Sequence, residues 1–364
     1  MKSYQFKSKL MDDIRSGRLG PGAFIGLTRE LSARHGIPQI TINRTLNELV
    51  REGVVERIRN RGTFVSRRYS PRKRLRIGIA FALPSVRDAS LQFFSAAFQI
   101  FPTYAKEVLN EAGYDRFEFS FDDLHRKDFD RGLKLDGLLL NTAMLDMNTI
   151  PNLLDKPYPV VSVQQSEPIP YLFHQVIPDL PNGFHEMAAR LRENGINELT
   201  LLFLLEETQM TRMKIFRLSA ACHGYSSEAF RENSTDCLSG DFGQLAGYKI
   251  GCAALKTHTP GMTYFSTSDI LSCGVLSAFF EQKLKPGIDF RLISFDNLEA
   301  EGLLPFGRPV LTSVDFPKRA IIRRAIRLIE EETASPSGET HIIKMPCALI
   351  ERETFFCQRQ KEPL

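Results

Sequence analysis

The sequence predicts an α/β protein with a small α+β domain at its N-terminus, and three observations support this fold class. Residues 28–65 contain two short helical patterns followed by a pair of strand-like runs. From residue 75 onward, strand-like runs alternate with helical patterns, which is typical of parallel sheets covered by helices. The charge changes at the same place, because residues 1–76 hold 18 Lys and Arg against 6 Asp and Glu, whereas the remainder holds 29 against 37.

The composition excludes several classes of protein. With 364 residues, of which 43% are hydrophobic and 25% charged, the chain can form two or three ordinary globular domains. No apolar run approaches the roughly 20 residues of a membrane span, and the N-terminal residues lack the apolar segment of a signal peptide. We therefore expect a cytoplasmic protein with no membrane partner. The six cysteines form no Cys-x-x-Cys pair, so we expect them to be reduced and mostly buried, with no metal and no cofactor.

The N-terminal domain is predicted to begin with three helices. In the first, over residues 4–16, apolar side chains recur on one face. The second would run from about Thr28 to Arg34, with Thr28 as its N-cap and the glycine at position 36 ending it. A turn of three to four residues then leads to the third helix.

The third helix is expected to begin near Pro38, whose fixed φ suits a first helical turn. Its apolar and polar residues separate into two faces at helical spacing. Polar side chains on such a face suit contacts with base edges and phosphates. The residues expected to face the core are Ile42, Leu46, Leu49 and Val50, and those expected to point outward are Gln39, Thr41, Asn43, Arg44 and Asn47.

Two strands are expected next, around a basic turn at Arg59-Asn60-Arg61-Gly62. Two helices joined by a short turn and followed by such a hairpin define a winged helix-turn-helix. Because the excess of positive charge coincides with this pattern, residues 1–66 are predicted to be a DNA-binding domain. Residues 67–74 form a basic linker, which either runs close to DNA or is a plain tether.

Several short motifs resemble those of the GntR family of bacterial transcription regulators, over residues 4–66. They are Ile14-Arg15-Ser16-Gly17-Arg18-Leu19-Gly20-Pro21-Gly22, Arg29-Glu30-Leu31, Thr41-Ile42-Asn43-Arg44-Thr45-Leu46 and Gly62-Thr63-Phe64-Val65. The resemblance implies DNA contacts from the second helix, the start of the third helix and the wing, with added phosphate contacts from Arg44. The residues concerned are Arg29, Pro38, Gln39, Ile40, Thr41, Asn43, Arg44, Arg61 and Gly62.

Gln39 and Asn43 stand where this family more often has arginine. The expected base preference changes accordingly, because Gln and Asn pair well with adenine whereas Arg prefers guanine.

The second region is expected to consist of alternating strands and helices. The expected strands are 75–83, 117–121, 137–140, 159–163, 199–205, 262–265, 291–295, 310–313, 340–345 and 348–351. The expected helices are 93–112, 182–194, 211–221, 242–255, 270–283 and 316–331.

The order and spacing of motifs in residues 75–356 resemble the effector domain of the LacI/GalR regulators. These motifs are Ile77-Gly78-Ile79, Gly113-Tyr114, Asp136-Gly137-Leu138, Gly240-Asp241-Phe242, Gly247-Tyr248, Ser268-Asp269, Ile293-Ser294-Phe295-Asp296, Leu311-Thr312-Ser313-Val314-Asp315 and Glu351-Arg352-Glu353. The resemblance implies that residues 75–364 form a two-lobed, doubly wound fold of the periplasmic-binding-protein type that binds an effector and dimerises.

The same resemblance implies an effector site between the lobes, at the carboxyl ends of the strands. A sugar would need planar side chains for its hydroxyls and an aromatic face for its ring. The implied residues are Phe93, Phe94, Gln164, Arg212, Phe242, Ser268 and Asp296. Ser268 occupies a position often filled by Asn in relatives, so the hydroxyl pattern recognised there would differ.

Structural roles are alternatives for several of these residues. Phe93 and Phe94 could belong to the core, Arg212 could pair with Glu206 or Glu207 on the surface, and Asp296 could be an N-cap.

Taken together, the sequence predicts a ligand-responsive transcription repressor. It would bind a pseudo-palindromic operator as a homodimer and be released by a small sugar-like effector. One alternative is a constitutive DNA-binding protein whose C-terminal domain only dimerises. An enzyme is disfavoured, because no glycine-rich phosphate loop, nucleophile elbow or carboxylate–histidine cluster occurs in the sequence.

Overall fold

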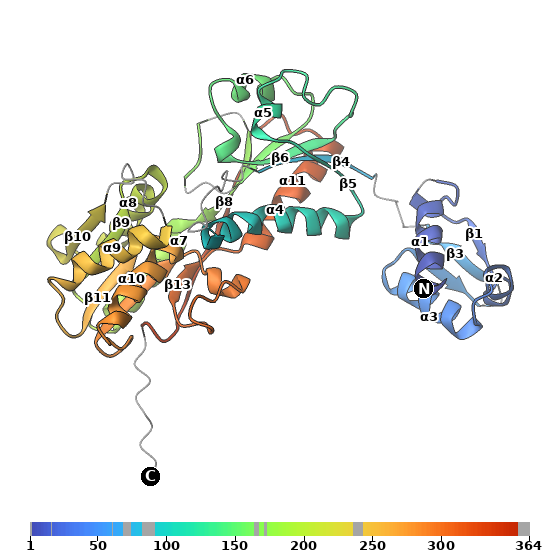
Figure 1. Ribbon diagram of the computed structural model, residues 1–364. Helices are drawn as coiled ribbons and strands as arrows, with labels where there is room; N and C mark the ends of the chain where they lie inside the picture. Colours follow the sequence, from blue (N-terminus) through green and yellow to red (C-terminus); the bar gives the residue numbers. More distant parts are fainter. Residues whose placement is uncertain are drawn as a thin grey trace, which may run out of the picture. The chain divides into compact units, whose positions relative to one another are not determined.

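The structure is a computed structural model that describes residues 2–15, 17–59, 61–67, 74–81, 92–163, 167–170, 173–235 and 243–355. The chain divides into two compact units, Met1–Arg74 and Leu75–Leu364, and most of their helices and strands are labelled in Figure 1. Each unit has a hydrophobic core of its own.

The N-terminal unit contains three helices and a small antiparallel sheet. The helices are α1 (Lys2–Arg15), α2 (Thr28–His35) and α3 (Gln39–Arg51), and the strands are β1 (Phe24–Gly26), β2 (Val55–Ile58) and β3 (Gly62–Val65) in the order β1-β3-β2. The apolar faces of the three helices and β3 meet in one buried cluster. The winged helix-turn-helix is therefore confirmed, and β1 is a third strand that the sequence did not predict.

Three local expectations for this unit were wrong or displaced. Leu27, not Thr28, is the N-cap of α2, and Thr28 is already helical. Pro38 is the N-cap of α3 rather than a residue of its first turn. Val50 is 38% exposed and is not a core residue, because it lies one position past the fully buried Leu49 and so at the edge of the buried face of α3. Gly36 does end α2, in the left-handed conformation with φ of 60°.

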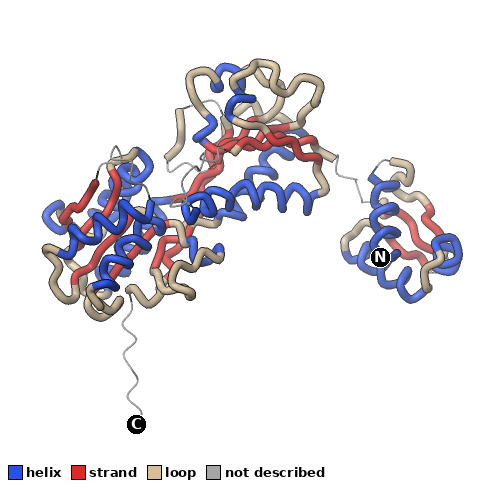
Figure 2. The backbone as a smooth tube through the Cα atoms, in the orientation of Figure 1, coloured by secondary structure: helices blue, strands red, loops and turns tan. Residues whose placement is uncertain are grey.

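The first lobe of the second unit is a six-stranded parallel sheet with helices on both faces (Figure 2). Its strand order is β14-β8-β7-β6-β4-β5. Helices α4 and α11 cover one face, and α5 and α6 cover the other. The bounds are β4 (Arg76–Ala80), α4 (Gln92–Ala112), β5 (Asp115–Glu118), α5 (Phe121–Leu124), β6 (Gly137–Asn141), α6 (Thr149–Leu154), β7 (Val160–Val163), β8 (His174–Asp179), α11 (Lys318–Ala334) and β14 (Ile342–Pro346).

The second lobe repeats this plan with the strand order β10-β9-β11-β12-β13-β15. Only the pairing of β13 with β15 is antiparallel. Helices α7 and α8 pack on one face of the sheet and α9 and α10 on the other. The bounds are α7 (Leu180–Glu193), β9 (Leu199–Leu204), α8 (Glu207–Ala221), β10 (Phe230–Thr235), α9 (Gly243–Leu255), β11 (Met262–Ser266), α10 (Asp269–Glu281), β12 (Phe290–Phe295), β13 (Thr312–Asp315) and β15 (Ala348–Ile350).

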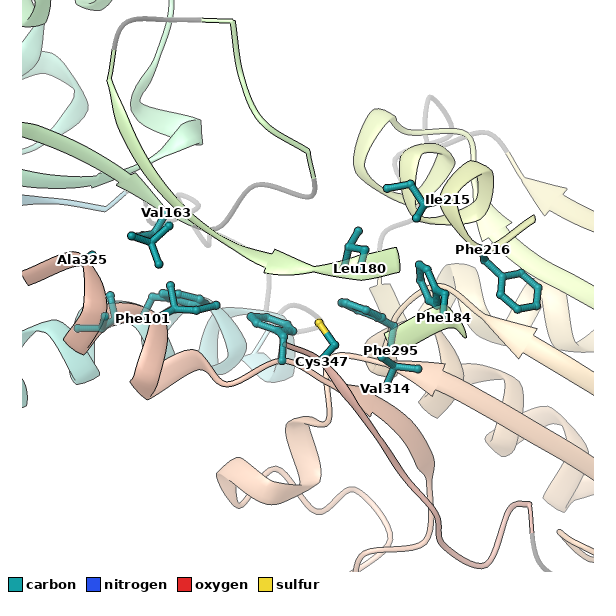
Figure 3. Close-up of a cluster of buried hydrophobic side chains, with 14 of the residues drawn as sticks. Phe101, Val163, Leu180, Phe184, Ile215, Phe216, Phe295, Val314, Ala325 and Cys347 are labelled. Atoms are coloured by element: carbon teal, nitrogen blue, oxygen red, sulfur yellow. The ribbon is translucent and has the colours of Figure 1, made fainter. Parts of the chain in front are cut away.

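The chain passes between the two lobes three times. The crossings lie between β8 and α7, between β13 and α11, and at Cys347 between β14 and β15. One continuous core follows them: Figure 3 shows Phe101, Val163 and Ala325 of the first lobe in line with side chains of the second. The ring of Phe316 is stacked on both Phe101 and Phe295. The two-lobed fold with crossing segments is confirmed.

Some elements of this unit differ from the sequence expectation. Strands β8 and β10 and helices α5 and α6 were not predicted as such. The strand expected over 117–121 ends at Glu118, because Ser120 caps α5 by accepting a hydrogen bond from the backbone N–H of Asp123 at 3.1 Å.

The cysteine expectation holds only in part. Among the described cysteines Cys273 and Cys347 are buried, Cys252 is half-buried and Cys222 is exposed, and all four are free thiols. No helix in the described ranges is both long and apolar enough to cross a bilayer.

Candidate DNA interface and effector site

Helix α3, which holds the position of the recognition helix in a helix-turn-helix, has clearly separated buried and exposed faces. Ile42, Leu46 and Leu49 are fully buried against the N-terminal core, which fixes the helix rotation. The opposite face presents Arg44 and Ile40, and Ile40 is 81% exposed. Of the other predicted contact residues in this stretch, Pro38 and Gln39 are exposed and Thr41 and Asn43 are half-buried.

The remaining predicted DNA contacts lie on α2 and on the wing. Arg29 on α2 and Arg61 at the tip of the wing are both exposed. Gly62 has φ of 105°, and a Cβ there would meet the ring of Phe24 at 2.7 Å. The close turn of the wing thus requires glycine at this position. Residues 68–73 of the predicted linker lie outside the described residues.

Arg57 on β2 ties the recognition helix to its neighbours, a role that the sequence analysis missed. One terminal nitrogen of its guanidinium donates to Asn43 Oδ1 at 2.7 Å and to Thr28 Oγ1 at 2.8 Å. The other donates to Asn47 Oδ1 at 3.0 Å. Thr28 Oγ1 also donates to Asn43 Oδ1 at 3.1 Å. An arginine next to the last residue of β2, just ahead of the wing turn, is the sequence signal for this arrangement.

At the carboxyl edge of the second lobe, Arg212 of α8 meets Asp296, which follows β12. The guanidinium contacts Asp296 Oδ1 at 3.0 Å, and the two side chains are 14% and 15% exposed. Arg212 also donates to the Thr267 carbonyl at 2.8 Å and lies over the Phe295 ring at 4.2 Å. The structure therefore brings together two of the residues named for the effector site, and it does not contain the surface pairing of Arg212 with Glu206 or Glu207.

The backbone at Asp296 adopts a conformation that non-glycine residues rarely use. Asp296 has φ of 108° and Asn297 has φ of 49°. The side chain of Lys318 stabilises this turn, since its Nζ donates to the Asp296 carbonyl and to Asp315 Oδ1 at 3.3 Å. Lys318 is only 3% exposed and was not predicted as a site residue.

Lys318 also connects this site to the other lobe. Its Nζ lies 3.7 Å from Glu301 Oε1, and Glu301 accepts a hydrogen bond from the Tyr104 hydroxyl of α4. Burial, followed by this hydrogen bond, raises the pKa of Tyr104 to about 12, so the hydroxyl remains a donor at neutral pH. A continuous polar chain therefore runs from α4 in the first lobe to Asp296 in the second.

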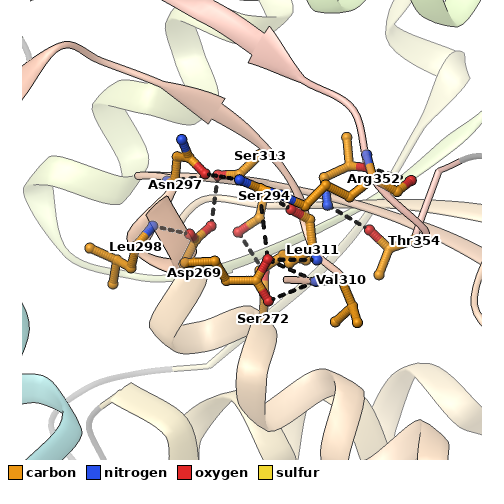
Figure 4. A network of polar contacts seen from close by, with 12 residues as sticks. Asp269, Ser272, Ser294, Asn297, Leu298, Val310, Leu311, Ser313, Arg352 and Thr354 are labelled. Carbon is orange, nitrogen blue, oxygen red and sulfur yellow. Dashed lines mark hydrogen bonds and ion pairs between the residues drawn. The ribbon is translucent and has the colours of Figure 1, made fainter. Parts of the chain in front are cut away.

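A second buried network holds the segment that carries Asp296 (Figure 4). Asp269 of α10 accepts hydrogen bonds from Ser313 Oγ at 2.8 Å and from the Leu298 N–H at 2.7 Å. Arg352 donates to Asn297 Oδ1 at 2.7 Å. Asp269 is 2% exposed, and burial, followed by the nearby Asp296 carboxylate, raises its pKa to about 7.

The other predicted effector residues are less fully placed. Ser268 lies beside Thr267, but its Oγ caps α10 by accepting from the Leu271 N–H at 3.3 Å. Phe93 and Phe94 are in the first turn of α4, and their side chains lie outside the described part of the chain. Gln164 and Phe242 also fall outside the described residues.

A pocket of about 360 Å³ lies at the opposite edge of the second lobe. Thr200, Arg231, Thr263 and Arg291, near the amino ends of β9, β10, β11 and β12, are among its lining residues. Asp296 follows the carboxyl end of β12, so this pocket is separate from the Arg212–Asp296 pair.

Domain comparisons agree with this architecture. Residues 3–65 match the bacterial regulatory proteins of the gntR family, and residues 188–355 match the periplasmic binding protein-like domain. The chain thus joins a GntR-type helix-turn-helix domain to a periplasmic-binding-protein-like domain.

Individual relatives cover the two parts separately. The transcriptional repressor NagR of Bacillus subtilis is 38% identical over 64 residues, which are 18% of this chain and 26% of NagR. The transcriptional regulator LacR of Lactobacillus helveticus is 22% identical over 197 residues, which are 54% of this chain and 58% of LacR. The chain therefore aligns with less than two thirds of either relative.

The fold of the second unit occurs in LacI-family structures. A LacI-family transcriptional regulator from Enterococcus faecium, solved with bound ribose, superposes with a TM-score of 0.59 at 18% identity. The superposition covers 77% of this chain and 98% of that one. At this level of identity the likeness concerns the fold.

Proposed function

We propose that the protein is a ligand-responsive transcription regulator that represses its genes by binding a pseudo-palindromic operator as a homodimer. A small sugar-like effector bound between the lobes would release it. The observation that carries this proposal is the presence, in one chain, of an exposed recognition helix and of a half-buried Arg212–Asp296 pair at the carboxyl edge of a periplasmic-binding-protein-like lobe. The relatives NagR and LacR are named as regulators, which favours this class over an enzyme.

On the DNA side, recognition helices of a dimer would enter successive major grooves about 34 Å apart. Arg29, Arg44 and Arg61 are exposed on α2, α3 and the wing, where they can reach phosphates. Such contacts would supply most of the affinity and make it depend on salt. Binding to chromosomal DNA would place this activity in the cytoplasm.

On the effector side, Arg212 and Asp296 would each bind sugar hydroxyls through two polar atoms. They contact each other in the structure, so an effector would exchange that ion pair for its own hydrogen bonds. The aromatic faces of Phe93, Phe94 and Phe242 and the amide of Gln164 would complete the site. The E. faecium regulator of the same fold was solved with ribose, which supports a sugar as the first class of ligand to test.

Effector binding would close the lobes and change the arrangement of the two DNA-binding domains. Allosteric coupling between two sites is typically about 1–3 kcal/mol, which here would change operator affinity about 5- to 150-fold. The coupling is reciprocal, so operator DNA should weaken effector binding by the same factor.

A thermal-shift screen against monosaccharides, disaccharides, sugar acids and purines tests the effector site. A ligand at 100 times its Kd should stabilise the protein by about 2.7 kcal/mol. Arg212→Ala and Asp296→Ala should abolish the shift, whereas Arg217→Ala, which removes an arginine of the same helix that pairs with Glu232, should retain it.

Operator titrations with and without the hit then test regulation. A fall in operator affinity supports an induced repressor, whereas a rise would identify a corepressor-dependent one. Sequence-specific DNA binding together with no ligand across the panel would favour the constitutive alternative.

A further inference from the structure

We propose that Ile40 reads a thymine methyl group in each operator half-site, and that Asn43 is a positioning residue rather than a reader of adenine. This inference rests on the proposed function and specifies how its recognition helix would discriminate bases. It departs from the sequence expectation that Asn43 pairs with adenine.

The first step concerns the acceptor capacity of Asn43. Its Oδ1 accepts hydrogen bonds from Arg57 at 2.7 Å and from Thr28 Oγ1 at 3.1 Å. Because a guanidinium can only donate, the carboxamide oxygen and not its nitrogen must face Arg57. Both lone pairs of that oxygen are therefore occupied within the protein.

The second step concerns what adenine needs. A bidentate Asn–adenine contact requires the carboxamide oxygen to accept from the adenine amino group while the carboxamide nitrogen donates to N7. With its oxygen engaged, Asn43 can present only N–H donors, so it cannot accept from the adenine amino group and cannot make this contact. Asn43 thus holds α3 against α2 and β2 through Arg57 and does not read adenine.

The third step concerns Ile40. It lies in the first turn of α3 and is 81% exposed, on the side opposite the buried Ile42. Arg44, one helical turn later on the same face, has an 86% exposed side chain suited to a phosphate. Ile40 therefore lies at the end of the helix that would enter the major groove. The feature that an apolar side chain can recognise on a base edge there is the C5-methyl group of thymine.

The experiment selects operator sequences from a random duplex pool with the full chain, then replaces each thymine of the selected half-site with uracil, which lacks the methyl group. At one thymine per half-site, replacement with uracil should lower operator affinity about fourfold. This factor corresponds to about 0.8 kcal/mol for one buried methyl group, because about 1.4 kcal/mol is a tenfold change in affinity. Ile40→Ala should bind the thymine and uracil operators equally. Val50→Ala, which removes another exposed apolar side chain of α3 at its far end, should keep the thymine preference.

Asn43→Ala tests the positioning role in the same assay. It should weaken binding to all sequences by a similar factor and leave the selected base preference unchanged, with circular dichroism confirming that the helices remain. Loss of an adenine preference at a single base pair in Asn43→Ala would overturn the inference. So would a half-site with no uracil-sensitive thymine, or a uracil effect that persists in Ile40→Ala.

Failure of the proposed function would look different. If the wild-type chain enriches no sequence from the pool, the regulator proposal itself fails and this inference falls with it. If a sequence is enriched but the uracil scan is flat, only the inference fails.

Discussion

The buried carboxyl of Asp269 should make the stability of the second lobe depend on pH between about 4 and 7. Its pKa is about 7 in the native protein, compared with 3.8 for a free aspartate. Because the native state then holds the proton more tightly than the unfolded chain, stability from this group is complete below pH 4 and is lost as the pH rises towards 7. The main cause is burial, and the Asp296 carboxylate adds to it.

The size of the effect follows from linkage. Each pKa unit corresponds to about 1.36 kcal/mol, so the full difference amounts to about 4 kcal/mol, of which about 2 kcal/mol falls between pH 5 and pH 7. Asp269→Asn removes the titrating group while keeping an oxygen that can accept from the Leu298 N–H and an amide that can donate to Ser313.

The assay is urea unfolding followed by far-ultraviolet circular dichroism at pH 5, 6 and 7. The free-energy difference between wild type and Asp269→Asn should shift by about 2 kcal/mol in favour of the variant as the pH rises. The matched control is Asp289→Asn. Asp289 lies in the loop before β12, and its Oδ2 accepts from the Lys285 N–H. This variant should keep the wild-type dependence of unfolding free energy on pH. A difference that is constant across these pH values would refute the assignment of the pKa to Asp269.

Three further predictions concern Lys318, Gly62 and Arg61. Lys318→Met should destabilise the second unit by about 3 kcal/mol in urea unfolding, since it leaves the partly buried carboxylates of Glu301 and Asp315 without their cation; an effect as small as that of Lys344→Met, at an exposed position, would contradict this. Gly62→Ala should cost about 1–3 kcal/mol of N-terminal unit stability and weaken operator binding, because alanine at φ of 105° is strained and meets Phe24; unchanged melting of this unit would count against it. Arg61→Ala should reduce the magnitude of the slope of log affinity against log salt concentration by about 1 and leave the base preference unchanged. A slope equal to that of the wild type would show that Arg61 does not contact a phosphate.

The sequence predicted the two architectures well, because each depends on patterns that are local in the chain. The spacing of Ile42, Leu46 and Leu49 fixed the rotation of α3, and the strand–helix alternation fixed the doubly wound lobes. Spacing patterns in the sequence led to wrong or incomplete predictions near the end of a helix and for a very short strand. Val50 satisfies the apolar spacing but lies at the edge of the buried face of α3, and β1 has too few residues to show any periodicity.

The candidate site was predicted less completely. Arg212 and Asp296 were named from family resemblance, and the structure brings them to 3.0 Å from each other. Lys318 was not predicted, because a lysine at the start of a helix is normally expected to be exposed to solvent. Its burial follows from the crossing between β13 and α11, which no spacing in the sequence reveals.

The sequence by itself determined the kind of module at each end of the chain, its helices and strands, and the residue types offered to DNA and ligand. Only the tertiary structure decided which of those side chains are free to act. Asn43 looks like an adenine reader in the sequence, yet Arg57 and Thr28 occupy its oxygen. The physical reason is that helical and strand periodicity is set by neighbouring residues, whereas a hydrogen-bond partner is set by how separate elements pack.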